Sequence, residues 1–94
     1  MDMRRLVGRN FARIRRAQGL TQEQIEERSG HNQQYLSSLE RGRRNPTVVT
    51  LFELAQALGV SHVELVQPDG EEVAPASQSS LRSVRTRKRN AGSP

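Results

Sequence analysis

Apolar residues recur along the first two thirds of this chain at the three- and four-residue spacing of amphipathic helices. The first such stretch covers residues 3–18, and its apolar face consists of Leu6, Val7, Phe11 and Ile14. Gly19 follows it as a helix stop, because glycine adopts the left-handed conformation that ends many helices. No segment alternates apolar and polar residues as a strand would, so we expect an all-α protein.

Two further helices are predicted by their capping residues. Thr21 and Gln24 have the spacing of a capping box, which opens a second helix that Gly30 ends. Asn32 is a favourable N-cap for a third helix, whose inward face carries two leucines three residues apart. Two short helices joined by a tight turn are therefore expected.

Proline and glycine delimit the last two helices. Pro46 excludes helical geometry at the residue before it, so a loop separates the third helix from the next. Thr47 then caps a fourth helix, which Gly59 ends. Ser61 and Glu64 have the spacing of a second capping box around a short fifth helix. The pattern thus predicts a compact five-helix domain.

Composition excludes several function classes. The chain has no cysteine, and its two histidines lack suitably spaced partners, so we expect no metal and no cofactor. Because the sequence contains no nucleophile–base set and no phosphate-binding loop, we expect that the protein is not an enzyme. No apolar run approaches a membrane span and no secretory signal follows Met1, which favours a cytoplasmic protein. With 94 residues there is no room for a separate small-molecule effector domain.

Charge is informative through its placement. The net charge is +5, from 15 basic and 10 acidic residues, and this balance suits a polyanionic partner. Arginines flank the third predicted helix, which opens with Gln33 and Gln34. A glutamine amide offers one donor and one acceptor in a plane and thereby matches adenine in the major groove. Double-stranded DNA is the expected partner. RNA is disfavoured, because exposed aromatic stacking platforms are missing.

Three segments occur in a distinctive order: GLTQ at 19–22, YLSSLERGRRNPT at 35–47 and LFELAQALGVS at 51–61. Together they resemble the Cro/cI-type helix-turn-helix regulators, the XRE-like family, over residues 7–66. The resemblance implies a lambda-repressor-like DNA-binding domain in which the third helix enters the major groove.

The resemblance also implies a role for individual residues. The positions that read bases correspond to Gln33, Gln34 and Ser38. The positions that bind the DNA backbone correspond to Gln22, Asn32, Tyr35, Arg41, Arg43 and Arg44. A structural ion pair between the first and third helices corresponds to Arg15 and Glu40. Glu26 and Ser29 depart from the family, which usually has small and apolar residues there. Either the Glu26 stem extends past the third helix to solvent, or the angle between the helices opens.

The leading interpretation is a sequence-specific transcriptional regulator that binds a short palindromic operator as a homodimer and is nucleoid-associated when bound. One half-site holds too few readable base pairs, and a second copy about one helical turn away doubles the information. The expected dimer surface contains Phe52, Val63 and Val66, whereas Leu65 faces the core. The alternative is a protein-interaction adaptor, for example an antitoxin-like partner binder, with DNA binding secondary. An adaptor would expose an apolar patch and would not need amides at the start of the third helix.

The character of the sequence changes after Gln67. Residues 68–94 are rich in Pro, Gly, Ser and Ala and show no periodicity, which predicts a disordered tail after a folded domain at residues 1–67. The tail begins acidic and becomes basic towards its end. Either it is a solubilising extension, or it is an electrostatic arm that increases non-specific DNA binding.

Overall fold

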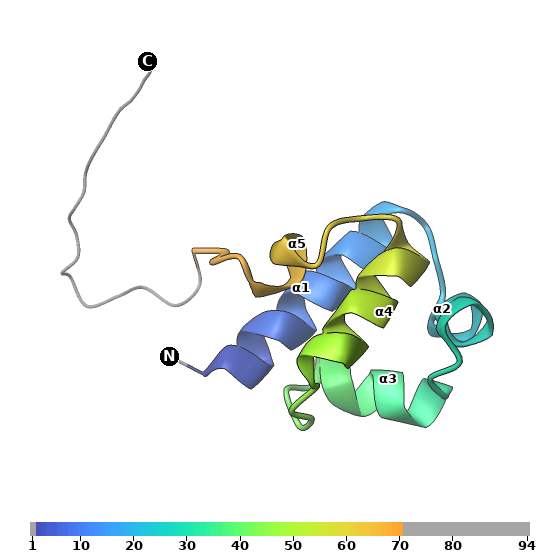
Figure 1. Ribbon diagram of the computed structural model, residues 1–94, viewed down its shortest axis with the longest axis horizontal. Coiled ribbons are helices and arrows are strands. Elements are labelled where there is room, and N and C mark those ends of the chain that lie inside the picture. Colours follow the sequence, from blue (N-terminus) through green and yellow to red (C-terminus); the bar gives the residue numbers. More distant parts are fainter. Residues whose placement is uncertain (1, 71–94) are drawn as a thin grey trace, which may run out of the picture.

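Five helices joined by short turns make up the structure, a computed structural model that describes residues 2–70 (Figure 1). They are α1 (Met3–Ala17), α2 (Gln22–Ser29), α3 (Gln33–Glu40), α4 (Val48–Leu58) and α5 (Val63–Val66). Residues 2–70 contain no strand, so the expected all-α fold is confirmed. None of these helices is long and apolar enough to cross a membrane.

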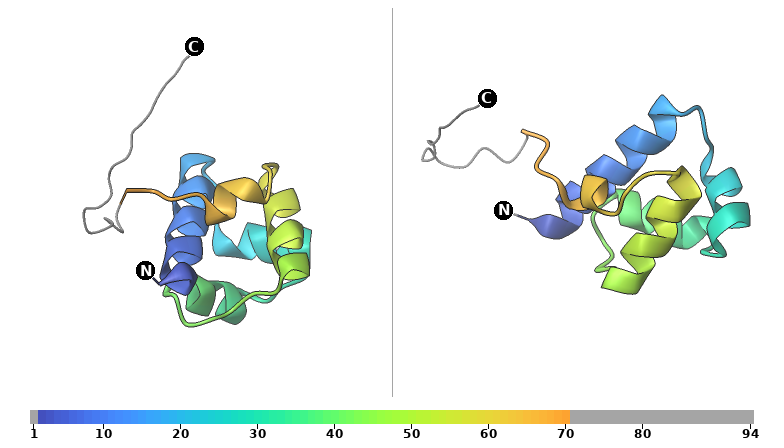
Figure 2. Two further views of the ribbon diagram at one scale, coloured as in Figure 1. Left: turned by 60° about the vertical axis from the view of Figure 1, so that its left-hand side comes forward. Right: turned by 45° about the horizontal axis from the view of Figure 1, so that its top comes forward.

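The helices pack in a closed ring. α1 contacts α3 and α5, α2 contacts α3 and α4, and α4 contacts α5. In the left view of Figure 2, α1 and α4 form opposite sides of this ring, with α5 above and α3 below. The ring holds α3 between α1 and α2, so both neighbours determine its orientation.

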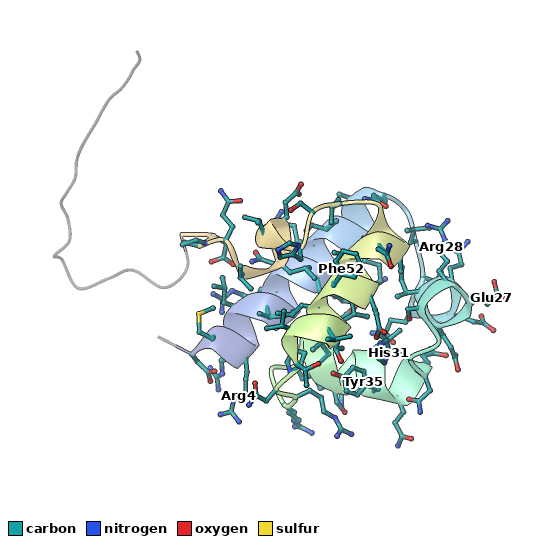
Figure 3. All side chains as sticks on the ribbon, viewed as in Figure 1. Arg4, Glu27, Arg28, His31, Tyr35 and Phe52 are labelled. Carbon is teal, nitrogen blue, oxygen red and sulfur yellow. The ribbon has the colours of Figure 1, made fainter. Side chains whose placement is uncertain are left out.

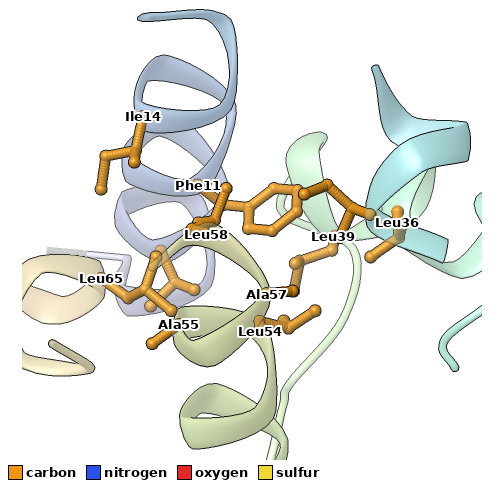
Figure 4. Close-up of a cluster of buried hydrophobic side chains, with 11 residues drawn as sticks. Phe11, Ile14, Leu36, Leu39, Leu54, Ala55, Ala57, Leu58 and Leu65 are labelled. Atoms are coloured by element: carbon orange, nitrogen blue, oxygen red, sulfur yellow. The ribbon is translucent and has the colours of Figure 1, made fainter. Parts of the chain in front are cut away.

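The core is almost entirely aliphatic, with the ring of Phe11 among leucines (Figure 4). All five helices contribute to it through Val7, Phe11, Ile14, Ile25, Leu36, Leu39, Leu54, Ala55, Ala57, Leu58 and Leu65. Each large apolar side chain buried in this way stabilises the fold by about 1.5–3 kcal/mol. α2 contributes a single core residue, Ile25, so its position depends strongly on that side chain.

The helix starts largely follow the predicted caps. The Thr21 hydroxyl accepts a hydrogen bond from the Gln24 N–H at 3.1 Å, and the Gln24 side chain accepts one from the Thr21 N–H at 2.8 Å. This reciprocal pair is the predicted capping box. Asn32 accepts from the Tyr35 N–H at 2.7 Å, and Thr47 caps α4 in the same way.

The second predicted capping box, at Ser61 and Glu64, is wrong. The Ser61 hydroxyl accepts from the Val63 N–H at 3.1 Å, one residue earlier than a capping box requires. The N-cap of α5 is His62, and its side chain makes no capping hydrogen bond. Because α5 has only four residues, a local serine turn is enough to begin it.

The chain remains attached to α1 beyond Gln67. Arg9 donates to both carboxylate oxygens of Asp69, at 2.9 and 3.2 Å. The side-chain amide of Asn10 donates to the Gln67 carbonyl at 2.9 Å. Most of the predicted tail, from residue 71 onward, lies outside the described residues.

Candidate nucleic-acid interface

The first turn of α3 presents two exposed amides. Gln33 and Gln34 open the helix, and neither side chain has a hydrogen-bond partner within residues 2–70. Ser38 follows Gln34 by four residues, so it lies on the same face one turn later, where it is half-buried. The donors and acceptors of both amides are therefore available to an external partner.

Two further polar side chains lie at helix starts near these amides. Gln22 is the first residue of α2 and is half-buried. Asn32 caps α3 through its oxygen, which accepts from the Tyr35 N–H. Its NH₂ group keeps both donors for an acceptor outside the protein. Helix starts also present unpaired backbone N–H groups, which favour anions.

The turn after α3 holds three exposed arginines, Arg41, Arg43 and Arg44. The backbone here is fixed by two hydrogen bonds of a Schellman motif. The Gly42 N–H donates to Leu39 and the Arg43 N–H to Ser38, each at 3.0 Å. Gly42 has a φ of 77°, a conformation that other residues rarely adopt. The three guanidinium groups thus extend from a well-defined turn.

A stack of side chains links this turn to the start of α3. The Arg44 guanidinium lies 5.4 Å from the centre of the Tyr35 ring, and the His31 ring stacks on Tyr35 at 5.4 Å. His31 in turn lies 2.9 Å from a carboxylate oxygen of Glu53 on α4. Figure 3 shows His31 and Tyr35 next to each other on the lower side of the molecule.

Burial raises the pKa of the Tyr35 phenol, and Arg44 offsets only part of this effect. The hydroxyl therefore stays protonated at neutral pH and can donate to an anion. No role for His31 was predicted from the sequence. Its spacing of four residues from Tyr35, directly before the N-cap of α3, is the signal that could have indicated the stack.

Arg15 and Glu40 form a bidentate ion pair that joins α1 to the end of α3. The distances are 2.7 Å from Nε to Oε2 and 3.1 Å from Nη2 to Oε1. Arg15 also donates to the Leu20 carbonyl at 2.8 Å, in the turn before α2. The two side chains are only 12% and 8% exposed. Together, these bonds of Arg15 connect α1 to the turn before α2 and to the end of α3.

Two residues of α1 that fix its contacts with α3 and with α5 were not predicted from the sequence. Gly8 lies on α1 where a Cβ atom would come within 2.9 Å of the Glu40 carbonyl oxygen and still closer to that of Leu39. Asn10 is fully buried; its amide also donates to the Leu65 carbonyl at 3.0 Å. Asn10 lies four residues from an apolar neighbour on either side, which is the sequence signal of a polar group in the core.

The two departures from the family pattern are accommodated locally. The Ser29 hydroxyl donates to the Ile25 carbonyl at 2.8 Å and accepts from the His31 N–H at 3.2 Å. Glu26 is half-buried, so part of its side chain remains accessible to solvent. Within residues 2–70 no group of three or more His, Cys, Asp or Glu side chains could hold a metal ion.

The family is decided by its helix-turn-helix model, which matches residues 11–65, more than half of the chain. The chain belongs to the helix-turn-helix family. This helix-turn-helix protein is 79% identical over 71 residues to an uncharacterized HTH-type transcriptional regulator, y4dJ, of Sinorhizobium fredii. The match covers 76% of this chain and 92% of that relative. The resemblance inferred from the sequence is thereby confirmed.

Solved structures of helix-turn-helix proteins share the fold. A hypothetical transcription factor from Neisseria, NHTF, superposes with a TM-score of 0.70 at 31% identity, over 74% of this chain and 80% of that one. The restriction-modification controller protein C.Esp1396I, solved as a tetramer with its natural 35 base-pair operator, superposes with a TM-score of 0.64 at 31% identity. That match covers 69% of this chain and 86% of the controller.

Proposed function

We propose that this helix-turn-helix protein is a transcriptional regulator that binds a short palindromic operator as a homodimer, with α3 in the major groove. The observation that carries the proposal is the pair of unpartnered amides at the start of α3, beside three exposed arginines in the turn that follows. A structural relative, C.Esp1396I, was solved as a tetramer on its operator, which supports a DNA partner and an oligomeric assembly.

Base recognition is assigned to the first two turns of α3. Only the N-terminal part of a recognition helix reaches the floor of the groove. Gln33 and Gln34 lie there with free amides, and Ser38 reaches towards the same face. A glutamine that binds adenine with two hydrogen bonds discriminates against other bases by about 1–3 kcal/mol.

Backbone recognition is assigned to the side chains that surround this helix start. The donors are the Gln22 and Asn32 amides, the Tyr35 hydroxyl and the guanidiniums of Arg41, Arg43 and Arg44. None of them distinguishes one base from another, since phosphates are the same along the duplex. They set the register of α3 on the DNA and supply affinity that falls with salt.

The dimer surface is assigned to α4 and α5. Phe52 is 50% exposed and Val63 is 52% exposed, with the His62 ring beside Phe52 at 6.4 Å between ring centres. Val66 is half-buried, and Leu65 is fully buried in the core. α4 and α5 contain no basic residue, so two copies can meet there without repulsion between cations.

The same exposed apolar residues favour the second candidate, a protein-interaction adaptor with DNA binding secondary. The exposed set also includes Val48 and Val49 at the start of α4. An adaptor would use this surface for a different protein, whereas the regulator uses it for a second copy. The two candidates therefore differ in whether the isolated chain dimerises and selects a DNA sequence.

The test is selection from a random duplex library, followed by titration of the selected duplex and a scrambled one over a range of salt concentrations. We expect an enriched palindrome bound about 10³-fold or more tighter than scrambled DNA. Gln33→Ala should relax specificity at one or two base pairs with an unchanged salt slope. Arg43→Ala should weaken binding to all sequences and flatten the slope by about 0.9 per protomer, or about 1.8 for a dimer. No enrichment, with the Gln33→Ala variant identical to the native chain, would refute the proposal.

A further inference from the structure

The arginines of the described residues divide into two groups by the contacts of their guanidiniums. One group donates hydrogen bonds of 2.7–3.2 Å to protein oxygens, and it consists of Arg9, Arg13, Arg15 and Arg28. The other group has no such hydrogen bond from its side chain, and it consists of Arg4, Arg5, Arg16, Arg41, Arg43 and Arg44. The guanidiniums of the first group are held by protein oxygens, whereas those of the second group donate no hydrogen bond to the protein and can bind an anion.

Arg4 and Arg5, in the first turn of α1, lie directly beside the turn after α3. A Cβ atom on Gly42 would come within 2.7 Å of Arg5 Cγ and 3.1 Å of its Cα, so the two backbones are in contact. Arg4 lines a hollow of about 140 Å³ together with Asn45 and Pro46 of the same loop. Figure 3 shows Arg4 on the lower side of the molecule, the side on which Tyr35 also lies.

These contacts bring together the first turn of α1 and the turn after α3, and both turns carry exposed arginines. The exposed arginines are Arg4, Arg5, Arg41, Arg43 and Arg44. Double-stranded DNA carries one phosphate charge per about 1.7 Å of its axis. A surface that binds phosphates at the turn after α3 therefore meets further phosphates on either side of that turn.

Asp2 is the acidic residue that faces this end of α1. Its carboxylate caps the helix by accepting from the N–H groups of Arg4 at 3.1 Å and Arg5 at 3.4 Å. The Nε atoms of both arginines lie 3.7 Å from its oxygens, and their side chains are 56% and 71% exposed. Ion pairs this exposed contribute little to stability, so a phosphate can take the place of the carboxylate at low cost.

We infer that Arg4 and Arg5 bind backbone phosphate next to the phosphates held by the turn after α3, and that Asp2 occupies both guanidiniums in the free protein. The inference rests on the proposed function, because it requires a DNA duplex on this face. The contact carries no sequence information and raises affinity for every duplex alike. Each phosphate contact adds about 0.9 to the salt slope of one protomer.

The test compares matched variants by the slope of log K against log salt concentration, on the selected operator and on scrambled DNA. Arg4→Gln and Arg5→Gln remove one charge each and keep an aliphatic stem. Arg16→Gln removes one charge at the other end of α1, about 18 Å along the helix axis, and controls for the loss of net charge. Arg4→Gln and Arg5→Gln should each lower the slope of a dimer by about 1.8, well beyond the effect of Arg16→Gln.

Asp2→Asn provides a test of opposite sign. Asparagine caps a helix as well as aspartate does, so α1 keeps its start while the competing carboxylate is lost. We expect affinity for both duplexes to rise by up to about fivefold. Thermal unfolding of Asp2→Asn, Arg4→Gln and Arg5→Gln, followed by circular dichroism, should match that of the native chain, since all three changes lie at the exposed start of α1.

Arg43→Gln separates failure of this inference from failure of the proposed function. If Arg43→Gln flattens the slope while Arg4→Gln and Arg5→Gln behave like Arg16→Gln, the inference is wrong and the proposed function stands. An Asp2→Asn variant that binds no tighter would equally refute the inference. If the native chain binds no duplex with measurable salt dependence, both are overturned.

Discussion

Replacing Gly8 by alanine sets two physical effects of opposite sign against each other. Gly8 lies inside α1, where glycine costs about 0.5–1 kcal/mol relative to alanine. Helix propensity alone therefore predicts that Gly8→Ala stabilises the protein. The structure predicts the reverse, because the new Cβ atom points at the backbone of the last turn of α3.

The magnitude follows from the distances at this contact. A Cβ atom at Gly8 would lie 2.9 Å from the Glu40 oxygen and 3.1 Å from the Glu40 carbonyl carbon. To restore an ordinary contact distance of about 3.4 Å, α1 and α3 must move apart by about half an ångström or more. This separation loses about a quarter of the dispersion energy between the two helices at this contact. Overpacking of this kind costs about 1–3 kcal/mol. We expect a net destabilisation of about 1–2 kcal/mol after the gain in propensity.

Thermal unfolding followed by circular dichroism measures the outcome. For a domain of this size, 1 kcal/mol corresponds to about 4–8 °C, so the melting temperature should fall by roughly 5–15 °C. Gly8→Leu is the control, since leucine is nearly as good a helix former as alanine but much larger. It should destabilise the fold further. A melting temperature that is unchanged or raised in Gly8→Ala would refute the close approach of the two backbones.

Two further predictions concern the ion pair and the dimer surface. Glu40→Leu leaves the buried Arg15 guanidinium without its carboxylate and should lower the free energy of unfolding in urea by about 3–5 kcal/mol. The double variant Arg15→Met and Glu40→Leu should recover most of this loss. If the effects of the two single variants simply add in the double variant, the two residues do not form a buried pair. Phe52→Ser should leave the fold intact, because Phe52 is half exposed. The dimer dissociation constant measured by analytical ultracentrifugation should rise about 10- to 100-fold, because apolar area is lost on both copies. An unchanged dissociation constant would show that the dimer interface does not contain Phe52.

Local signals in the sequence predicted most of the fold. Helix starts at Thr21, Asn32 and Thr47 depend on a side chain and an N–H group three residues away, so the sequence contains both partners. The predicted capping box at Ser61 was wrong because α5 is only one turn long. The start of such a short helix depends on how the chain packs back against α1. Leu65 is fully buried in the core and Phe52 is half exposed, as expected from the sequence.

The features that were missed depend on contacts between distant segments. The role of Gly8 depends on the close approach of α3 to α1. The role of Asn10 depends on the carbonyls of Leu65 and Gln67, which accept hydrogen bonds from its amide. The contact between Arg5 and Gly42 joins residues that no local pattern relates. The ion pair of Arg15 and Glu40, also distant in the chain, was expected only through the family resemblance.

The unpartnered amides of Gln33 and Gln34 also have an evolutionary consequence. Since neither side chain contributes a hydrogen bond to the fold, mutations at these two positions cost almost no folding free energy. Under the proposed base recognition, such mutations change the preferred operator, so after a gene duplication the two copies can diverge in target while they keep the same scaffold. The residues at the start of α3 can therefore change without loss of stability, whereas the residues where α1 contacts the last turn of α3 cannot.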